Sequence, residues 1–196
     1  MEQYLLDLSM KLKGAVFTSF DTETTGLNPD KGDRIIEIGG ISFDRRGIRS
    51  RFNSLINPGI PVPEKATEIN GITNKMLEKA PGTSKVIQDF CAFTGNSILL
   101  AYNAGFDIAF LKTELQRIKY EYKIKEYYDI LKVVRDVFPG EPSYKLQVIA
   151  PKLGIQAKDA HRAEDDARVA MEVFLKAMEV VNKEQILQEK NPSLIQ

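Results

Sequence analysis

The chain has 196 residues, and its 27 basic and 27 acidic side chains leave a formal net charge of zero. Hydrophobic residues make up 43% and charged residues 28%, which is ordinary for one globular domain and excludes bulk disorder. The balanced charge also excludes a polycation that coats long nucleic acids, so any grip on nucleic acid must be local. A single cysteine, Cys91, excludes an internal disulfide and is typical of a reducing compartment.

The first residues lack a basic segment followed by a long apolar run, and no apolar stretch is long enough to span a bilayer. We therefore expect a cytoplasmic protein without a membrane partner. Residues 1–13 predict an N-terminal extension that contains a short amphipathic helix over 3–12.

Three strands are expected next. Residues 14–20 are apolar and β-branched, which predicts a buried strand. Residues 34–43 and 48–56 predict two more strands, joined by a turn at 44–47, so the three form an antiparallel meander. The prolines between residues 58 and 63 then end the strand pattern.

Helices alternate with short strands in the rest of the chain. The expected strands lie over 97–102 and around Tyr127 and Tyr128, and helices are expected over 73–79, 84–94, 106–118, 130–137 and 145–153. A last helix begins near Ala163, and its apolar stripe consists of Ala167, Ala170, Phe174 and Met178.

This order predicts an α/β fold with an RNase H-like mixed five-stranded sheet, in which three antiparallel strands are followed by parallel additions and flanked by helices. Residues 14–181 form the predicted domain, and residues 182–196 are predicted to be a C-terminal tail.

Two carboxylates stand together at the end of the first predicted strand, in Asp21-Thr22-Glu23. Side chains two residues apart on a strand point to the same face, so Asp21 and Glu23 project together. Buried like charges repel each other and lose solvation, and a divalent cation relieves both penalties. A solvated strand end is the alternative, and this pair alone does not decide between the two.

Two further motifs precede predicted helices. Asp107 falls in the first turn of a helix, just after Asn103-Ala104-Gly105-Phe106, where the helix dipole favours an anion. The only histidine, His161, stands just before the last helix and is followed by Glu164, Asp165 and Asp166. Each motif alone is typical of an ordinary helix start. Periodicity leaves open whether Asp165 or Asp166 points inward.

Taken together, Asp21-x-Glu23, the group from Asn103 to Asp107, and His161 with Asp166 closely resemble the three motifs of the DEDD exonuclease superfamily, histidine branch. Residues 21–27, 35–39, 69–73 and 138–140 also resemble the proofreading exonucleases of bacterial DNA polymerase III, both the epsilon subunit and the polymerase-C type. The resemblance covers roughly residues 15–178.

The resemblance implies a metal-dependent 3′-5′ exonuclease that hydrolyses single-stranded DNA ends to nucleoside 5′-monophosphates in proofreading or repair. It makes His161 the general base and selects Asp166 over Asp165. Two divalent cations, Mg²⁺ or Mn²⁺, are then held by four carboxylates, Asp21, Glu23, Asp107 and Asp166.

Four positions match those at which the family contacts substrate or completes its second motif: Thr24, Leu27, Asn103 and Phe106. The chain departs from the family at Tyr102 and Asn70, where the family often has histidine. A DNA polymerase III catalytic subunit is the protein partner that the resemblance implies. The candidates for guiding the strand are seven basic side chains, Arg45, Arg46, Arg49, Arg51, Lys145, Lys158 and Arg162.

Alternatives remain at this point. A 3′-5′ exoribonuclease of the same superfamily is the nearest, because the four acids do not read the sugar and RNA stays an eligible substrate. An inert nucleic-acid-binding module and a polymerase adaptor belong to a different class. The complete set of acids with its histidine disfavours the inert module.

Overall fold

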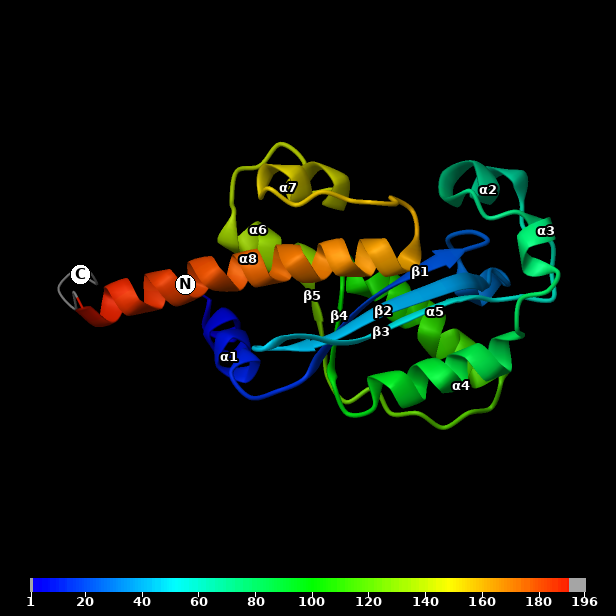
Figure 1. The fold of residues 1–196 in the computed structure, drawn as a ribbon, viewed down its shortest axis with the longest axis horizontal. Coiled ribbons are helices and arrows are strands. Elements are labelled where there is room, and N and C mark those ends of the chain that lie inside the picture. The colour runs from blue at the N-terminus through cyan, green and yellow to red at the C-terminus, as the bar shows by residue number, and fades with distance from the viewer. Residues whose placement is uncertain (1, 191–196) are drawn as a thin grey trace.

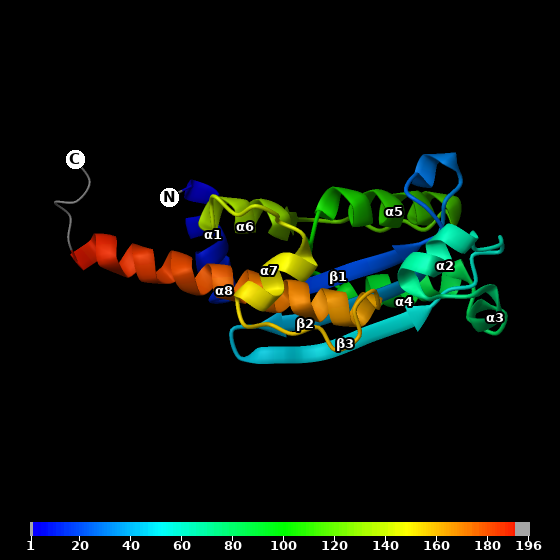
Figure 2. The same cartoon turned by 90° about the horizontal axis from the view of Figure 1, so that it is seen from above.

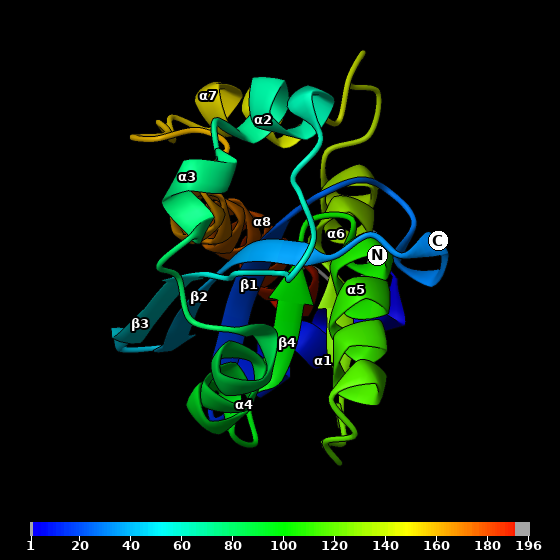
Figure 3. The ribbon, with the colours of Figure 1, turned by 90° about the vertical axis from the view of Figure 1, so that its right-hand side faces the viewer.

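The structure is a computed structural model that describes residues 2–190, and it contains one five-stranded mixed sheet with helices on both faces (Figures 1 and 3). The strand order is β3-β2-β1-β4-β5. The first three strands pair antiparallel, and the last two are added parallel to the first. The predicted fold class is therefore confirmed. The strands are β1 (Phe17–Thr24), β2 (Ile35–Asp44), β3 (Gly47–Leu55), β4 (Ile98–Ala101) and β5 (Tyr127–Asp129).

Helices cover the two faces of the sheet separately (Figure 3). One apolar cluster joins the sheet to α1 (Gln3–Leu12), α6 (Ile130–Val137), α7 (Leu146–Lys152) and α8 (Ala163–Lys190). The opposite face packs against α4 (Thr83–Thr94) and α5 (Ala104–Arg117).

Three short elements complete the fold. The single-turn helix η1 (Pro29–Lys31) follows β1, and α2 (Glu64–Asn70) and α3 (Asn74–Leu77) follow β3. Figures 1 and 2 both place α2 beyond the end of β1 and beside the start of α8. Side chains from several distant segments can therefore meet at this end of the sheet.

The alternation along β1 divides its side chains between the two cores. Phe17 packs against Phe174 of α8 with ring centroids 5.7 Å apart, whereas Phe20 packs against Phe90 of α4 at 5.5 Å. Asp21 and Glu23 continue the line of Phe17, so they lie on the α8 face. The same strand thus supplies core at its beginning and carboxylates at its end.

Three elements differ from the sequence-based expectation. Strand β1 continues through Thr24 because β2 keeps pairing with it, so the acids lie within the strand. Helix α2 was not expected, since seven residues are too few to show a clear apolar period. Helix α8 continues to Lys190, through most of the predicted tail, and residues 191–196 lie outside the described part.

The predicted stripe of the last helix is confirmed, since its four side chains are all buried. The division into an extension, a domain over 14–181 and a tail stays a prediction. Among the described residues, no helix is both long and apolar enough to cross a membrane.

Candidate active site

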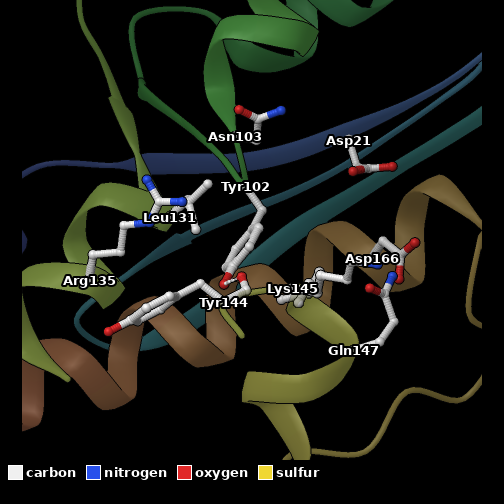
Figure 4. Close-up of a pocket in the computed structure, with 10 residues that line it drawn as sticks. Asp21, Tyr102, Asn103, Leu131, Arg135, Tyr144, Lys145, Gln147 and Asp166 are labelled. Carbon is white, nitrogen blue, oxygen red and sulfur yellow. Dashed lines mark hydrogen bonds between the residues drawn. The ribbon is translucent and has the colours of Figure 1, made fainter. Parts of the chain in front are cut away.

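Four acidic side chains from three elements gather at the end of β1. Asp21 and Glu23 come from the strand, Asp107 from the first turn of α5, and Asp166 from the first turn of α8. Figure 4 shows Asp21 and Asp166 on facing elements at the rim of one cavity. Glu23, Asp107 and Asp166 are buried, and Asp21 is half-buried.

Asp107 is held in place by the strand that carries the first two acids. Its Oδ1 accepts hydrogen bonds from the backbone N–H of Thr22 at 3.0 Å and from the Thr22 hydroxyl at 2.7 Å. Asn103, which precedes the helix, adopts a left-handed φ of 65°, and its N–H donates to Asp129 at 2.9 Å. These contacts fix the start of α5 between β1 and β5.

His161 occupies a sharp corner before α8. Its φ is 63°, a left-handed value that is uncommon for a residue other than glycine. Its N–H donates to Asp166 Oδ2 at 3.1 Å, and its side chain is exposed. Ligand atoms of Glu23, His161 and Asp166 lie within 4.8 Å of one another, so these three groups can hold a metal ion.

The structure distinguishes the two neighbouring aspartates. Asp165 accepts hydrogen bonds from the backbone N–H groups of Lys158 and Asp159 and forms an ion pair with Arg168 at 2.8 Å. The Asp165 carboxylate is therefore already bound by groups of its own loop and of α8. Asp166 lies beside Glu23 and Asp21, and its assignment as a metal ligand stays a prediction.

Burial raises the pKa of all four clustered acids, and repulsion from other acids of the cluster adds to the rise for Asp21 and Glu23. Burial raises the pKa of Glu23 to about 8, with a further contribution from Asp166, and raises that of Asp107 to about 7. The pKa of Asp21 lies well above its usual range because of burial and then Asp107. The pKa of Asp166 is raised by burial.

Within residues 2–190, no lysine or arginine forms an ion pair with any of these four acids. Buried carboxylates without cationic partners are unfavourable when ionised, and a bound divalent cation offsets that penalty. Oxygen ligands of this kind suit Mg²⁺, Mn²⁺ or Ca²⁺. The donor set therefore fits a divalent metal ion.

Two cavities open on either side of the acids. The first has a volume of about 480 Å³ and polar walls, and Figure 4 shows Tyr102, Asn103, Arg135 and Lys145 lining it beside Asp21. Arg135 lies over the ring of Tyr144 at 5.6 Å, and the Tyr102 hydroxyl donates to the Tyr144 carbonyl at 2.5 Å.

The second cavity, of about 490 Å³, is largely apolar. Leu27 and Ile69 are exposed by 76% and 65%, the highest values among the large apolar side chains described. Both line this cavity together with Phe106 and Glu23, so the acids are next to an apolar surface that is open to solvent. Thr24 also lines it, and its hydroxyl donates to the Gly26 carbonyl at 2.6 Å.

Sequence reasoning did not place Ile69 or Arg135 in the site, and it named Asn70 only as a departure from the family. Ile69 and Asn70 lie on the unexpected helix α2; Asn70 accepts the Ile72 N–H at 3.0 Å, and its side-chain hydrogen bond to Glu23 opposes the rise in that pKa. The available signals were Pro63 before the helix and Gly71 after it. Arg135 gave no signal, because it stands in an ordinary helix.

The seven basic candidates fall into different environments. Arg49 pairs with Asp44, Arg51 with Glu164, and Arg162 with Glu37, so these three cations are already engaged. Arg45 and Arg46 are exposed on the turn after β2. Lys145 lines the first cavity, and Lys158 lines a third one beside Arg51 and Arg162.

The sheet and its acid cluster define a nuclease of RNase H-like architecture. Residues 18–174 match the model of the exonuclease family that is named for RNase T. The chain therefore belongs to this exonuclease family. The predicted recognition and the predicted class of activity, a 3′-5′ exonuclease, are confirmed.

Two relatives illustrate the similarity. The chain is 45% identical over 160 residues to the DNA polymerase III subunit epsilon of Treponema pallidum, which covers 81% of this chain and 74% of the relative. It is 35% identical over 178 residues to the PolC-type DNA polymerase III of Thermotoga petrophila, covering 91% of this chain but 13% of that polymerase.

Solved structures share the fold. Escherichia coli exonuclease I in complex with single-stranded DNA matches with a TM-score of 0.73 and 19% identity, covering 92% of this chain and 42% of that one. Exonuclease X in complex with 5′-overhanging duplex DNA matches with a TM-score of 0.65 and 23% identity, covering 85% of this chain and 92% of the other.

Proposed function

We propose that this exonuclease removes nucleotides one at a time from the 3′ end of single-stranded DNA and proofreads for a DNA polymerase III. In this proposal, Asp21, Glu23, Asp107 and Asp166 hold two Mg²⁺ or Mn²⁺ ions. The observation that carries the proposal is the cluster of four acids with raised pKa values and no lysine or arginine partner among the described residues.

His161 is the proposed general base. When bound, the metal ions would supply an activated water and stabilise the charge that develops on the leaving oxygen. His161 lies beside Glu23 and Asp166 and is open to solvent, so its ring can accept a proton from a water at the acids. The Thr22 bonds hold Asp107 in one orientation, which preserves the ligand geometry between turnovers.

The two cavities give the substrate an orientation. We place the terminal base in the apolar cavity, between Leu27 and Ile69 and against Phe106. Thr24 and Asn70 line the same cavity and are the polar groups nearest the terminal sugar in this placement. The preceding phosphates then run past Asn103 through the polar cavity, where Arg135 and Lys145 attract them.

Single-strand preference follows from this placement. A base that enters the apolar cavity has left its stack and its partner, which costs a few kcal/mol in a duplex and less at a mismatch. The proposed partner is a DNA polymerase III catalytic subunit, supported by the names of the two relatives described above. Work beside a replicative polymerase would place the protein in the cytoplasm.

The test is digestion of 5′-labelled single-stranded DNA and RNA of one sequence. With Mg²⁺ or Mn²⁺ we expect DNA to shorten stepwise from its 3′ end to nucleoside 5′-monophosphates, with no activity in EDTA. Preferred digestion of the RNA would establish the exoribonuclease alternative instead. Cleavage of a circular single strand, or full activity in EDTA, would contradict the proposal.

A further inference from the structure

Glu37 is a buried acid close to the site that has no part in the mechanism above. It faces Glu23 across the β1–β2 pair and is fully buried. Unlike the four clustered acids, it has a cationic partner. Its carboxylate accepts hydrogen bonds from Nη2 of Arg162 at 2.7 Å and from Nε of Arg162 at 3.1 Å, and also from the Ala163 N–H at 3.3 Å.

The partner of Glu37 follows His161 directly in the chain. Glu37 therefore holds the two residues after the histidine, while Asp166 holds the histidine's own N–H. A left-handed residue in the corner is unfavourable on its own, so surrounding contacts must maintain it. Together these bonds fix the backbone on both sides of His161.

The backbone of β2 lies in close contact with the turn that His161 forms before α8. A Cβ atom placed on Gly39 of β2 would lie 2.2 Å from the Glu164 nitrogen and 2.3 Å from the Ala163 carbonyl carbon. Only glycine allows α8 to begin this close to the strand. Glu37 and Gly39 lie on the same face of β2, so one strand fixes both the depth and the orientation of the corner.

We infer that the forked ion pair between Glu37 and Arg162 positions His161 over the acid cluster and thereby sets the rate of hydrolysis. This inference rests on the proposed role of His161 as general base. Glu37 and Arg162 are positioning residues, because they act through the histidine. The geometry of the fork carries the effect, since an exposed side chain on a loop has few other contacts to orient it.

A second ion pair in the molecule provides a matched control. Glu114 is also fully buried, and it accepts two hydrogen bonds from Arg34, at 2.7 and 3.0 Å. This pair joins the segment before β2 to α5, and within residues 2–190 it forms no hydrogen bond or ion pair with His161 or the four acids. Loss of either pair disturbs packing, but only loss of the first should move the histidine.

The experiment is a double-mutant cycle in which hydrolysis of single-stranded DNA is measured at saturating Mn²⁺. The test variant is Glu37→Gln/Arg162→Met, which keeps the net charge, leaves an acceptor for the Ala163 N–H and fills the space of the arginine stem. It is made in the wild-type chain and in the His161→Ala chain. Arg162→Lys, which keeps the charge but loses the fork, and Glu114→Gln complete the set.

In the wild-type chain we expect the test variant to lower kcat by about 10²-fold or more, approaching the loss of about 10²–10⁴ expected for His161→Ala. In the His161→Ala chain the same two substitutions should change kcat by less than about threefold, because residues that act as a unit are non-additive. Arg162→Lys should also lower kcat, whereas Glu114→Gln should lower thermal stability and leave kcat unchanged.

An equal loss in both backgrounds, or a wild-type kcat for the test variant, would overturn the inference. A wild-type kcat for Arg162→Lys would also overturn it, because charge alone would then suffice. These results leave the proposed function intact as long as His161→Ala remains impaired. If His161→Ala keeps the wild-type rate, the general-base role fails instead, and with it the premise of the positioning role.

Discussion

Two kinds of buried carboxylate stand within one small domain. Glu37 and Glu114 are fully buried, and each is matched by the fork of an arginine. The acids at the end of β1, such as Asp107 and Glu23, are buried without a lysine or arginine partner among the described residues. Both kinds lie on the same sheet or the helices packed against it, so the difference does not come from depth in the fold.

The contrast distinguishes buried carboxylates that are neutralised within the fold from buried carboxylates that are left available to a ligand. In a buried ion pair, each charge is compensated by its partner, so neither group needs a further ligand. Unpaired buried acids leave the folded protein less stable than it would otherwise be, until a cation binds. In the proposed function, the clustered acids therefore represent stability that is given up for metal binding, and the following predictions separate the two kinds.

The largest expected effect is on activity. Asp21→Asn and Asp107→Asn should each lower kcat by about 10³-fold or more, because loss of a metal ligand removes several kcal/mol of transition-state stabilisation. Glu114→Gln is the matched control and should keep kcat. Rates are measured on single-stranded DNA below the melting temperature of every variant. Similar losses in all three variants would erase the distinction between paired and unpaired acids.

Next in size are two adjacent glycines on opposite faces of β2. Gly39→Ala pushes against the start of α8 and should lower kcat by about 10²-fold, the scale of a 1 Å misplacement at a catalytic group. Gly40→Ala instead meets Phe93 and Phe90 at 3.0 and 3.2 Å, so it should reduce stability by about 1–3 kcal/mol and keep kcat. Steady-state kinetics and thermal melting distinguish them, and equal kcat values would contradict the predicted position of the corner.

A smaller effect concerns pH in the absence of metal. The folded pKa values of Glu23 and Asp107, about 8 and about 7, are raised above the unfolded values by burial. The protons of these groups stabilise the fold at low pH, and that contribution is lost as pH rises through the folded pKa values. In EDTA, the free energy of unfolding should fall by a few kcal/mol between about pH 5 and pH 8.

Urea unfolding at several pH values measures this fall. The double variant Glu23→Gln/Asp107→Asn should show a flatter profile over the same range, because it lacks two of the titrating groups. A stability that rises toward pH 8 in the wild-type protein would show that the clustered acids are not strained by burial.

The smallest predicted effect is that of Asp165→Asn, which is compared with the large effect at its neighbour in sequence, Asp166. Asp165 is satisfied by its own loop and by Arg168, whereas Asp166 belongs to the unpaired set. Asp165→Asn should lower stability by about 1–2 kcal/mol and leave kcat within about threefold of the wild type. Asp166→Asn should nearly abolish hydrolysis. An active Asp166→Asn enzyme beside an inactive Asp165→Asn enzyme would reverse the assignment.

Much of the fold was predictable from local pattern. The antiparallel meander and most helices were predictable from the spacing of their apolar residues. In the folded chain these residues form the core, as the buried residues of β2 and of the α8 stripe show. Helix α2 was missed because its seven residues leave Ile69 on the surface. The end of β1 was missed because the strand keeps pairing with β2 through Thr24, beyond the last of its apolar residues.

The gathering of the four acids was predictable for a different reason, namely the combination of three motifs, and their role in catalysis stays a prediction. Their partners were not predictable. The bond from Thr22 to Asp107 joins residues 85 positions apart, and the one from Arg162 to Glu37 joins residues 125 apart. No local pattern encodes such pairs, so the distinction between paired and unpaired acids appears only when the chain is folded.

The most direct test of that distinction is thermal melting of the wild-type protein and Asp107→Asn at pH 8, in EDTA and in saturating Mn²⁺. The asparagine oxygen can still accept both Thr22 hydrogen bonds, so the comparison isolates the charge. In EDTA, Asp107→Asn should melt at a higher temperature than the wild type, because it lacks a buried unpaired charge. In Mn²⁺ the order should reverse, because the wild type gains more from the ion. If the wild type melts higher in EDTA and Mn²⁺ leaves both proteins unchanged, the clustered acids are not a metal site.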